Sequence, residues 1–299
     1  MIFFNSVDQI QLFLLKELFT HGEQITSRNL LTLEICNINL CLTDPKNRKT
    51  NIPSRKWNFA LAIGEFAWHL SGSNNLNFIT YYAKQWKEFS SDGKQILESC
   101  YGHKIFSKNE RDESQWDRLV ALMKNDNFTR RAVLDLYNSA NGINYTSKDI
   151  ACVSTVQFLI RNKKLDAIVN MRSNDLIWGL PYDIFLFTML QEMLALELNF
   201  DLGSYYHNVA SMHIYEKHFE LGHNMLNSEY FISQSMDEMK DLNSTNIFLT
   251  FENKIRTSAI QLNEIIELSI DDYWKKLLLI LLDFKALNIN KTRNSISIV

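Results

Sequence analysis

The stretch MRSNDLIWGLPYDIF, residues 171–185, places one arginine and two aspartates in a segment that is otherwise largely apolar. Arg172 and Asp175 precede a Gly-Leu-Pro turn, and Asp183 follows it. The guanidinium fork of an arginine suits phosphate oxygens by geometry as well as by charge. The stretch raises the question of why an arginine and two acids lie so close together in a mostly apolar segment.

Three further stretches carry residues that could do chemistry: TRR (129–131), IACVSTVQF (150–158) and ASMHIYEKH (210–218). Each has an ordinary structural explanation by itself. Adjacent arginines are usually a solvated pair, a single cysteine is usually a small core residue, and a His-x-Tyr in a strand is usually a satisfied polar pair. A function follows only if the stretches share one site.

One more acid, Glu65, stands inside the apolar segment WNFALAIGEFAWHLS (57–71). Burial disfavours the charged form of a carboxyl group and raises its pKa. A raised pKa suits a group that must both hold and release a proton near neutral pH. Glu65 is therefore unusual for its surroundings, and a raised pKa is expected for its carboxyl group.

The elements that must position these residues follow from the spacing of apolar residues. Helical spacing covers residues 6–21, 57–71 and 182–200, and it returns beyond about residue 220, most clearly at 254–269 and 271–286. Strand patterns cover residues 29–43, 130–138, 152–173 and the start of 204–218, and RNKK (161–164) predicts a hairpin-like turn. We expect one α+β domain over residues 1–299, with a divergent helical region at 219–299.

Composition narrows the class of protein. The 299 residues are 46% hydrophobic and 22% charged, which is usual for a soluble domain. The net charge of -3 gives no general basic field for nucleic acid. The longest apolar run, YWKKLLLILLDF, is too short and too interrupted to span a bilayer. The four cysteines match no zinc pattern and no signal peptide opens the sequence, so we expect reduced thiols, a cytoplasmic location and no metal.

Taken in chain order, the motifs resemble the thymidylate synthase family. That family carries a basic pair, Pro-Cys-His, Gln-Arg-Ser-x-Asp, Gly-x-Pro-Phe-Asn and His-x-Tyr-x-x-His. The corresponding residues here are Arg130-Arg131, Cys152, Arg172-Ser173-Asn174-Asp175, Gly179-Leu180-Pro181-Tyr182-Asp183 and His213-Ile214-Tyr215-Glu216-Lys217-His218. Upstream, GEFAWHLSGSNN (64–75), YGHKIF (101–106) and SRNLLTLEI (27–35) extend the likeness, which covers roughly residues 20–218.

The resemblance implies a thymidylate synthase-like fold, a mixed sheet packed with helices, and a thiolate that adds to C6 of a pyrimidine nucleotide. It assigns Cys152 as nucleophile, with Arg172 as its cationic neighbour and a phosphate ligand, because a nearby arginine lowers the pKa of a thiol. Glu65 with Tyr101 would manage water and protons at the base.

The resemblance also assigns binding roles. The substrate ligands would be Arg28, Arg130, Arg131, Arg172, Ser173, Gln157, His213 and Tyr215, of which His213 and Tyr215 would bond the sugar 3′-hydroxyl. Asp175 and Trp86 would face the folate. In the family the basic pair crosses from a second subunit, which implies a homodimer.

Asp183 stands where thymidylate synthases carry an asparagine whose amide donates to O4 of uracil and accepts from N3–H. A carboxylate can only accept hydrogen bonds. Cytosine offers an N4 amino donor at that position, and its N3 is a donor when protonated. An aspartate therefore favours cytosine, as in the deoxycytidylate hydroxymethylase branch of the family.

Other positions also depart from the family pattern. Val153 replaces the histidine after the cysteine, and Ala151, Met171 and Ser211 replace a proline, a glutamine and an aspartate. The C-terminal sequence NKTRNSISIV differs from the short apolar tail that closes thymidylate synthases over folate. A site open to water would favour hydration of the methylene over its reduction.

The sequence thus predicts a homodimeric enzyme that uses 5,10-methylenetetrahydrofolate to hydroxymethylate C5 of a cytidine monophosphate, dCMP or CMP. Two alternatives remain open: reductive methylation of a uridylate or cytidylate by the ordinary thymidylate synthase route, and a nucleotide-binding homologue without catalysis. Formation of dihydrofolate would identify the first alternative. Nucleotide binding without release of tritium from 5-tritiated dCMP or CMP would identify the second.

Overall fold

The strands form one mixed sheet in a computed structural model that describes residues 1–27, 29–142 and 146–296. The sheet order is β1-β3-β8-β6-β5-β4, with β2 paired to β3 and the short β7 paired to β8. The strands are β1 (Ile2–Phe4), β2 (Glu23–Ser27), β3 (Leu30–Leu42), β4 (Val133–Asp135), β5 (Val153–Arg161), β6 (Lys164–Met171), β7 (Asn174–Asp175) and β8 (Asp201–Tyr215).

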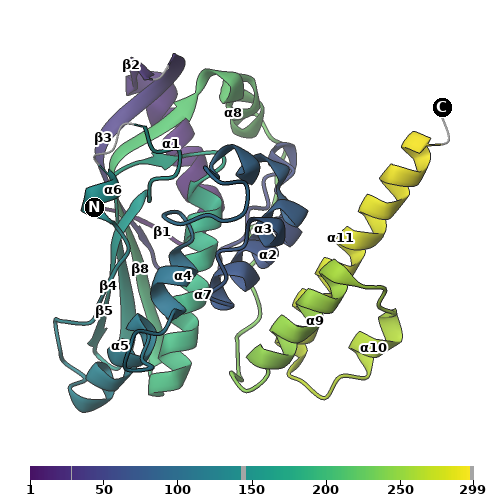
Figure 1. The fold of residues 1–299 in the computed structure, drawn as a ribbon. Helices are drawn as coiled ribbons and strands as arrows, with labels where there is room; N and C mark the ends of the chain where they lie inside the picture. Colours follow the sequence, from purple (N-terminus) through teal and green to yellow (C-terminus); the bar gives the residue numbers. More distant parts are fainter. Residues whose placement is uncertain (28, 143–145, 297–299) are drawn as a thin grey trace.

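Helices pack against this sheet and against one another (Figure 1). The α-helices are α1 (Val7–His21), α2 (Phe59–Leu70), α3 (Leu76–Tyr82), α4 (Tyr101–Phe106), α5 (Gln115–Asn125), α6 (Ser139–Gly142), α7 (Leu180–Leu198), α8 (Phe219–Leu226), α9 (Thr245–Thr257), α10 (Leu262–Ile266) and α11 (Asp272–Ile296). The 3-10 helices are η1 (Pro53–Arg55), η2 (Lys84–Glu88) and η3 (Glu216–His218).

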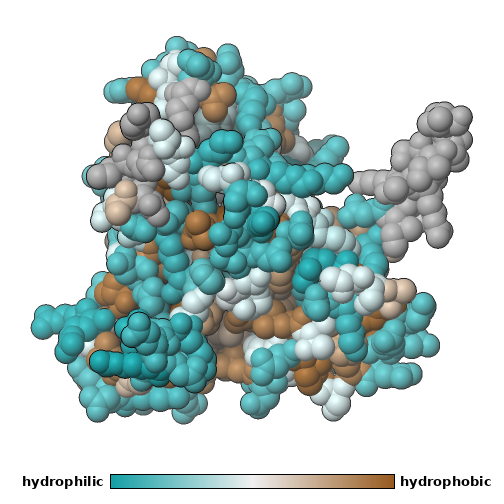
Figure 2. All heavy atoms as spheres, viewed as in Figure 1, coloured by the Kyte–Doolittle hydropathy of each residue, from teal (hydrophilic) through white to brown (hydrophobic). Residues whose placement is uncertain are grey.

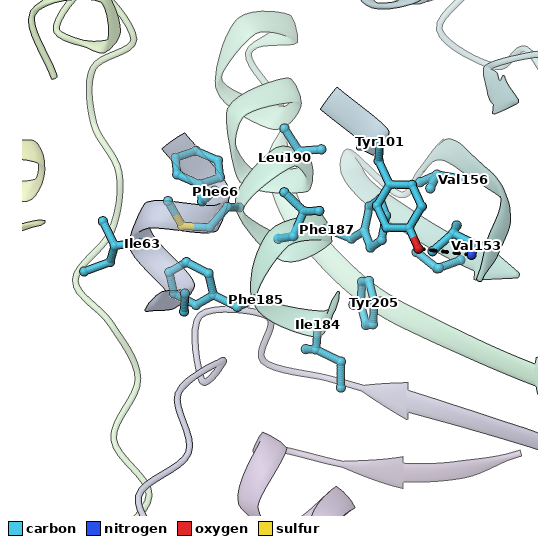
Figure 3. Close-up of a cluster of buried hydrophobic side chains, with 14 of the residues drawn as sticks. Ile63, Phe66, Tyr101, Val153, Val156, Ile184, Phe185, Phe187, Leu190 and Tyr205 are labelled. Atoms are coloured by element: carbon cyan, nitrogen blue, oxygen red, sulfur yellow. Dashed lines mark hydrogen bonds between the residues drawn. The ribbon is translucent and has the colours of Figure 1, made fainter. Parts of the chain in front are cut away.

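Helix α7 is the central helix, as the apolar segment after the Gly-Leu-Pro turn predicts. Pro181 stands in its first turn, where a missing N–H costs nothing, and Asn199 ends it in a left-handed conformation with φ of 58°. The helix connects β6 to β8, two parallel neighbours in the sheet, and packs on both. Its buried side chains meet those of α2 and of the sheet (Figure 3).

The β5–β6 hairpin brings two of the polar stretches together. Asn162 and Lys163 form the predicted turn, both with positive φ. The antiparallel register then pairs Val153 with Met171. Residues that lie about twenty positions apart in the sequence therefore become neighbours at one end of the sheet.

The two faces of the sheet differ in burial. Along β5, β6 and β8, buried residues largely alternate with half-buried ones. The buried set, which includes Val156 and Tyr205, faces the helices (Figure 3). Because alternate residues of a strand point to opposite faces, the half-buried set lies on the other face.

The region beyond residue 218 is mainly helical, with an irregular segment over residues 228–241, and polar contacts link it to the rest of the chain. Tyr82 donates to Glu252 at 2.7 Å. Helices α9 and α11 pack on each other and on α2. In the view of Figure 2, hydrophobic residues gather in the lower middle of the molecule, between the sheet and these helices. None of the helices in the described ranges combines the length and apolar character that a membrane crossing requires.

Two predicted elements differ from the structure. The helix expected at 254–269 is wrong as a continuous element, because α9 ends at Thr257 and Gln261 caps α10 together with Glu264. The strand expected at 130–138 shortens to Val133–Asp135, which pairs with β5, although Ala132 and Leu136 each share one further backbone hydrogen bond with that strand. The helices expected at 6–21, 57–71 and 182–200 are confirmed.

Candidate active site

Cys152 lies directly before β5 and is half-buried beside Arg172. The Arg172 Nη2 atom is 3.7 Å from the Cys152 Sγ atom. The same guanidinium group donates to the carbonyl oxygens of Ala151 at 2.8 Å and Ile150 at 3.1 Å. These bonds hold the cation against the sulfur, and a cation at this position favours the thiolate, the nucleophilic form of cysteine.

Tyr101, the first residue of α4, supports the same turn from the other side. Its hydroxyl oxygen accepts hydrogen bonds from the backbone N–H groups of Cys152 at 3.3 Å and Val153 at 3.4 Å, the second of which is drawn in Figure 3. Burial first, and then the nearby Cys152 and Asp183, raise the pKa of the Tyr101 hydroxyl. Tyr101 therefore remains a neutral phenol that fixes the backbone of the nucleophile.

Glu65 lies on α2, facing this group. Burial, followed by the charge of Asp183, raises the pKa of the Glu65 carboxyl to about 8. His69, one turn later, is kept neutral because burial lowers its pKa to about 3. Its Nδ1 accepts from the Gly102 backbone N–H, and its Nε2 lies 3.9 Å from Glu65. Glu65 thus has the proton affinity that its predicted shuttle role requires.

Asp183, in the first turn of α7, has a similarly raised proton affinity. Burial is the main cause, and the charge of Asp175 adds to it. A hydrogen bond from Asn174 lowers the pKa, but the net effect raises the pKa of Asp183 to about 7. Because Asp183 also raises the pKa of Glu65, the two carboxyl groups lie close enough to affect each other. We refer to Cys152, Arg172, Tyr101, Glu65 and Asp183 as the Cys152 cluster.

Beside the cluster, β7 and β8 place three of the other predicted residues together. Asp175 pairs with His213 in the parallel β7–β8 ladder, and the His213 and Tyr215 rings meet edge to face with centroids 5.1 Å apart. The Asp175 carboxylate accepts from the Ile177 backbone N–H at 2.8 Å. Ser173, half-buried, lies between Arg172 and β7.

The remaining predicted residues lie elsewhere. Arg130 and Arg131 are exposed ahead of β4. Gln157 donates to the Arg130 carbonyl oxygen at 2.8 Å, so in this chain its amide holds that segment. Trp86 packs edge-on against Trp68, with ring centroids 5.3 Å apart. Arg28, a predicted phosphate ligand, lies outside the described residues.

Sequence reasoning missed three buried polar residues that reach Asp183: Asn174, His207 and Tyr205. They form a series of hydrogen bonds that ends at the Asp183 carboxyl. A signal for two of them was available. Tyr205 and His207 occupy alternate positions of a strand whose same-facing neighbours Gly203 and Val209 are buried, so both had to point into the core.

A surface hollow of about 510 Å³ lies away from the Cys152 cluster. It is lined by Asp44, Lys46 and Lys164 among others, together with residues at the end of α7. Its lining includes none of the five cluster residues. We therefore assign this hollow no role in the chemistry of the Cys152 cluster.

Together, the mixed sheet and the cluster define an α+β protein whose site pairs a cysteine and its arginine with two carboxyl groups of raised proton affinity. The chain belongs to the thymidylate synthase family: the family model matches residues 10–267. A thermostable thymidylate synthase A from Bacillus subtilis shares the fold, with a TM-score of 0.63 and 23% identity over 79% of this chain and 90% of that one. The predicted fold is confirmed.

Similar proteins carry names from two activities. A deoxyuridylate hydroxymethyltransferase of Bacillus phage SP01 is 30% identical over 69% of this chain and 56% of its own length. A deoxycytidylate 5-hydroxymethyltransferase of Enterobacteria phage T4 is 33% identical over 46% of this chain and 59% of its own length. A thymidylate synthase of Bacillus atrophaeus is 29% identical over 55% of this chain and 73% of its own length. The chain therefore spans less than two thirds of the length of these hydroxymethyltransferases.

Proposed function

We propose that this protein is a folate-dependent hydroxymethyltransferase that acts on C5 of a cytidine monophosphate. The observation that carries the choice of base is Asp183, a carboxyl in the first turn of α7. Its ionised form can only accept hydrogen bonds, and a pKa of about 7 lets it give its proton to cytosine N3 near neutral pH. A protonated carboxyl donates one hydrogen bond and accepts another. Facing cytosine, it would donate to N3 and accept from the N4 amino group. Transfer of its proton to N3 would leave a carboxylate that accepts from both N3–H and the N4 amino group.

The steps follow from the cluster. The Cys152 thiolate, held beside Arg172, adds to C6 and makes C5 nucleophilic. C5 forms a bond to the methylene carbon of the folate and then loses its proton, and tetrahydrofolate leaves with the electrons of its bond to that carbon. Water adds to the resulting exocyclic methylene, and the thiolate leaves C6. The product is the 5-hydroxymethyl nucleotide, and no electron is transferred to or from the folate.

The carboxyl groups have separate roles in this scheme. Glu65, with a pKa of about 8, can take a proton from water or return it near neutral pH. Asp183 binds the base. Arg172 keeps the sulfur ionised, and with Ser173 it would bind the nucleotide phosphate. His213 and Tyr215 would contact the sugar.

The residues near Asp175 suit a flat, anionic co-substrate such as a folate. Trp178 is 48% exposed, and the Lys217 ammonium lies 4.2 Å from its ring centroid. An exposed indole offers a surface for a planar ring system, and a nearby cation suits a carboxylate. 5,10-methylenetetrahydrofolate would supply the one-carbon unit at the oxidation level that hydroxymethyl transfer requires.

The proposed assembly is a homodimer in the cytoplasm. The exposed Arg130 and Arg131 have no described contact with the Cys152 cluster of their own chain, so a second subunit is the proposed recipient of their phosphate contacts. The half-buried face of the sheet offers an extended surface for such a subunit. The four cysteines, all within the described residues, are thiols rather than disulfides, which suits a reducing compartment.

Deoxyuridylate is the second candidate substrate, because the relative from Bacillus phage SP01 carries that name. Incubation with 5,10-methylenetetrahydrofolate and each of dCMP, CMP, dUMP and UMP, followed by mass detection of products, separates the candidates. We expect a hydroxymethyl product from dCMP or CMP. Turnover of dUMP with no turnover of either cytidylate would refute the assignment based on Asp183.

A further inference from the structure

A buried hydrogen-bond network connects strand β8 to the carboxyl of Asp183. The Tyr205 hydroxyl and His207 Nδ1 are 2.9 Å apart, His207 Nε2 and Asn174 Oδ1 are 2.9 Å apart, and Asn174 Nδ2 donates to Asp183 Oδ2 at 2.7 Å. Tyr205, His207 and Asn174 are 0%, 1% and 2% exposed. We call these four residues the Tyr205–Asp183 network.

The chemistry of the four residues fixes which atom donates and which accepts in each hydrogen bond of the network. Burial lowers the pKa of His207 to about 3, so the imidazole is neutral and carries a single N–H. The Tyr205 ring is enclosed near Ile184 and Phe187 (Figure 3), and its hydroxyl proton finds an acceptor at His207 Nδ1. The His207 N–H must then be at Nε2, where it donates to the Asn174 carbonyl oxygen.

This direction fixes the orientation of the Asn174 amide. Its oxygen is bound by His207, so only its NH₂ group can point to Asp183. The backbone leaves room for that group, because a Cβ atom at Gly179 would lie 2.6 Å from Asn174 Nδ2 and 2.9 Å from the Asp175 carbonyl oxygen. A side chain at position 179 would therefore displace the donor.

We propose that Asn174, oriented by His207 and Tyr205, is a positioning residue that sets the base preference of the site through Asp183. The inference rests on the proposed function in one respect, namely that Asp183 faces the base. Because Asp183 Oδ2 accepts from Asn174, the network holds the carboxyl in one rotamer. In that rotamer we place Oδ2 beside N3 of the base, where it would carry the proton that passes to N3, and Oδ1 beside the 4-substituent, where it would accept from the N4 amino group. The pattern of donor and acceptor that meets the base is then unique.

The same network predicts how an amide would behave at position 183. In an Asp183→Asn variant, the amide oxygen must turn toward the Asn174 NH₂ group, because two NH₂ groups cannot bond each other. The new NH₂ group then points away from Asn174, toward the base, where it can donate to O4 of uracil. Without Asn174, the amide would be free to adopt either orientation.

The test measures kcat/KM for dCMP and for dUMP and compares their ratio among variants. We expect Asn174→Ala to lower the dCMP:dUMP ratio about tenfold, the scale of one hydrogen bond to an ionisable group. Asp183→Asn should shift the ratio toward dUMP in the otherwise wild-type protein. In the Asn174→Ala variant, adding Asp183→Asn should shift the ratio much less. Thr188→Val is the matched control, because Thr188 is equally buried on α7 and donates only to the carbonyl oxygens of that helix.

Equal losses on both nucleotides in Asn174→Ala, with the ratio unchanged as in Thr188→Val, would overturn the proposal, because they indicate a purely structural role. If Asn174→Ala does not fold, Tyr205→Phe removes a single hydroxyl group from the network. A smaller shift of the ratio in the same direction then supports the proposal, and an unchanged ratio refutes it.

Failure of the proposed function gives a different result. A wild-type protein that prefers dUMP would contradict the cytidylate assignment, while a change of ratio in Asn174→Ala would still support the role of the network. If neither nucleotide is converted, the ratio is taken from the dissociation constants of dCMP and dUMP. A ratio of dissociation constants that Asn174→Ala leaves unchanged would again overturn the proposal.

Discussion

Replacing Asp183 by asparagine should change how the stability of the protein depends on pH. The folded-state pKa of Asp183 is raised from 3.8 to about 7, chiefly by burial. Between these values the unfolded chain ionises Asp183 while the folded protein keeps the proton, so the unfolded state is favoured increasingly as pH rises. The loss of stability levels off once pH exceeds the folded-state pKa.

The size of the effect follows from the two pKa values. Integrated between about pH 5 and pH 8, a shift from 3.8 to about 7 costs the wild-type protein about 3 kcal/mol of unfolding free energy. Asparagine does not titrate, so the variant avoids this loss. Relative to wild type, Asp183→Asn should therefore be more stable at pH 8 than at pH 5 by about 3 kcal/mol.

Urea unfolding at several pH values, followed by circular dichroism, measures this difference. Subtracting the wild-type curve from the variant curve removes the contributions of other acids that act independently of Asp183. Asp117→Asn is the control, because hydrogen bonds from Ser114 lower the pKa of Asp117. Asp117 is therefore ionised in both the folded and the unfolded state from about pH 5 upward, and the difference curve of its variant should be flat. A flat curve for Asp183→Asn would refute the burial argument.

Three further predictions concern the Cys152 cluster. Cys152→Ala should abolish tritium release from 5-tritiated dCMP while dCMP binding persists, and retained release would exclude Cys152 as nucleophile. Glu65→Gln should lower kcat about a hundredfold with little change in nucleotide affinity, and it should remove a titration near pH 8 from the kcat profile; a kcat equal to that of wild type would argue against the proton shuttle. Arg172→Gln should slow alkylation of Cys152 by iodoacetamide, because the thiolate loses its cation at 3.7 Å; an unchanged alkylation rate would show that Arg172 does not favour the thiolate.

The parts of the fold that could be predicted are those with strong local patterns. The apolar helix after the Gly-Leu-Pro turn and the hairpin at residues 161–164 follow from spacing and turn chemistry. The pairing of Cys152 with Arg172 was expected because both lie in motifs of one family. The break between α9 and α10 was missed because the capping pair Gln261–Glu264 interrupts a pattern that is apolar on both sides.

The Tyr205–Asp183 network could not be predicted from sequence, because it depends on long-range register. Asn174 meets Asp183 only after the chain turns at Gly179, and it meets His207 only because β7 folds back beside β8, the strand that carries His207. Neither contact has a local sequence signature. The raised pKa of Asp183 likewise depends on burial that only the packed structure provides.

One measurement can show whether water rather than hydride completes the reaction on a cytidylate. The protein is incubated with dCMP and 5,10-methylenetetrahydrofolate in water enriched in heavy oxygen, and the nucleotide product is analysed by mass spectrometry. We expect a 5-hydroxymethyl nucleotide that carries heavy oxygen, together with tetrahydrofolate. A 5-methyl nucleotide accompanied by dihydrofolate would contradict this expectation.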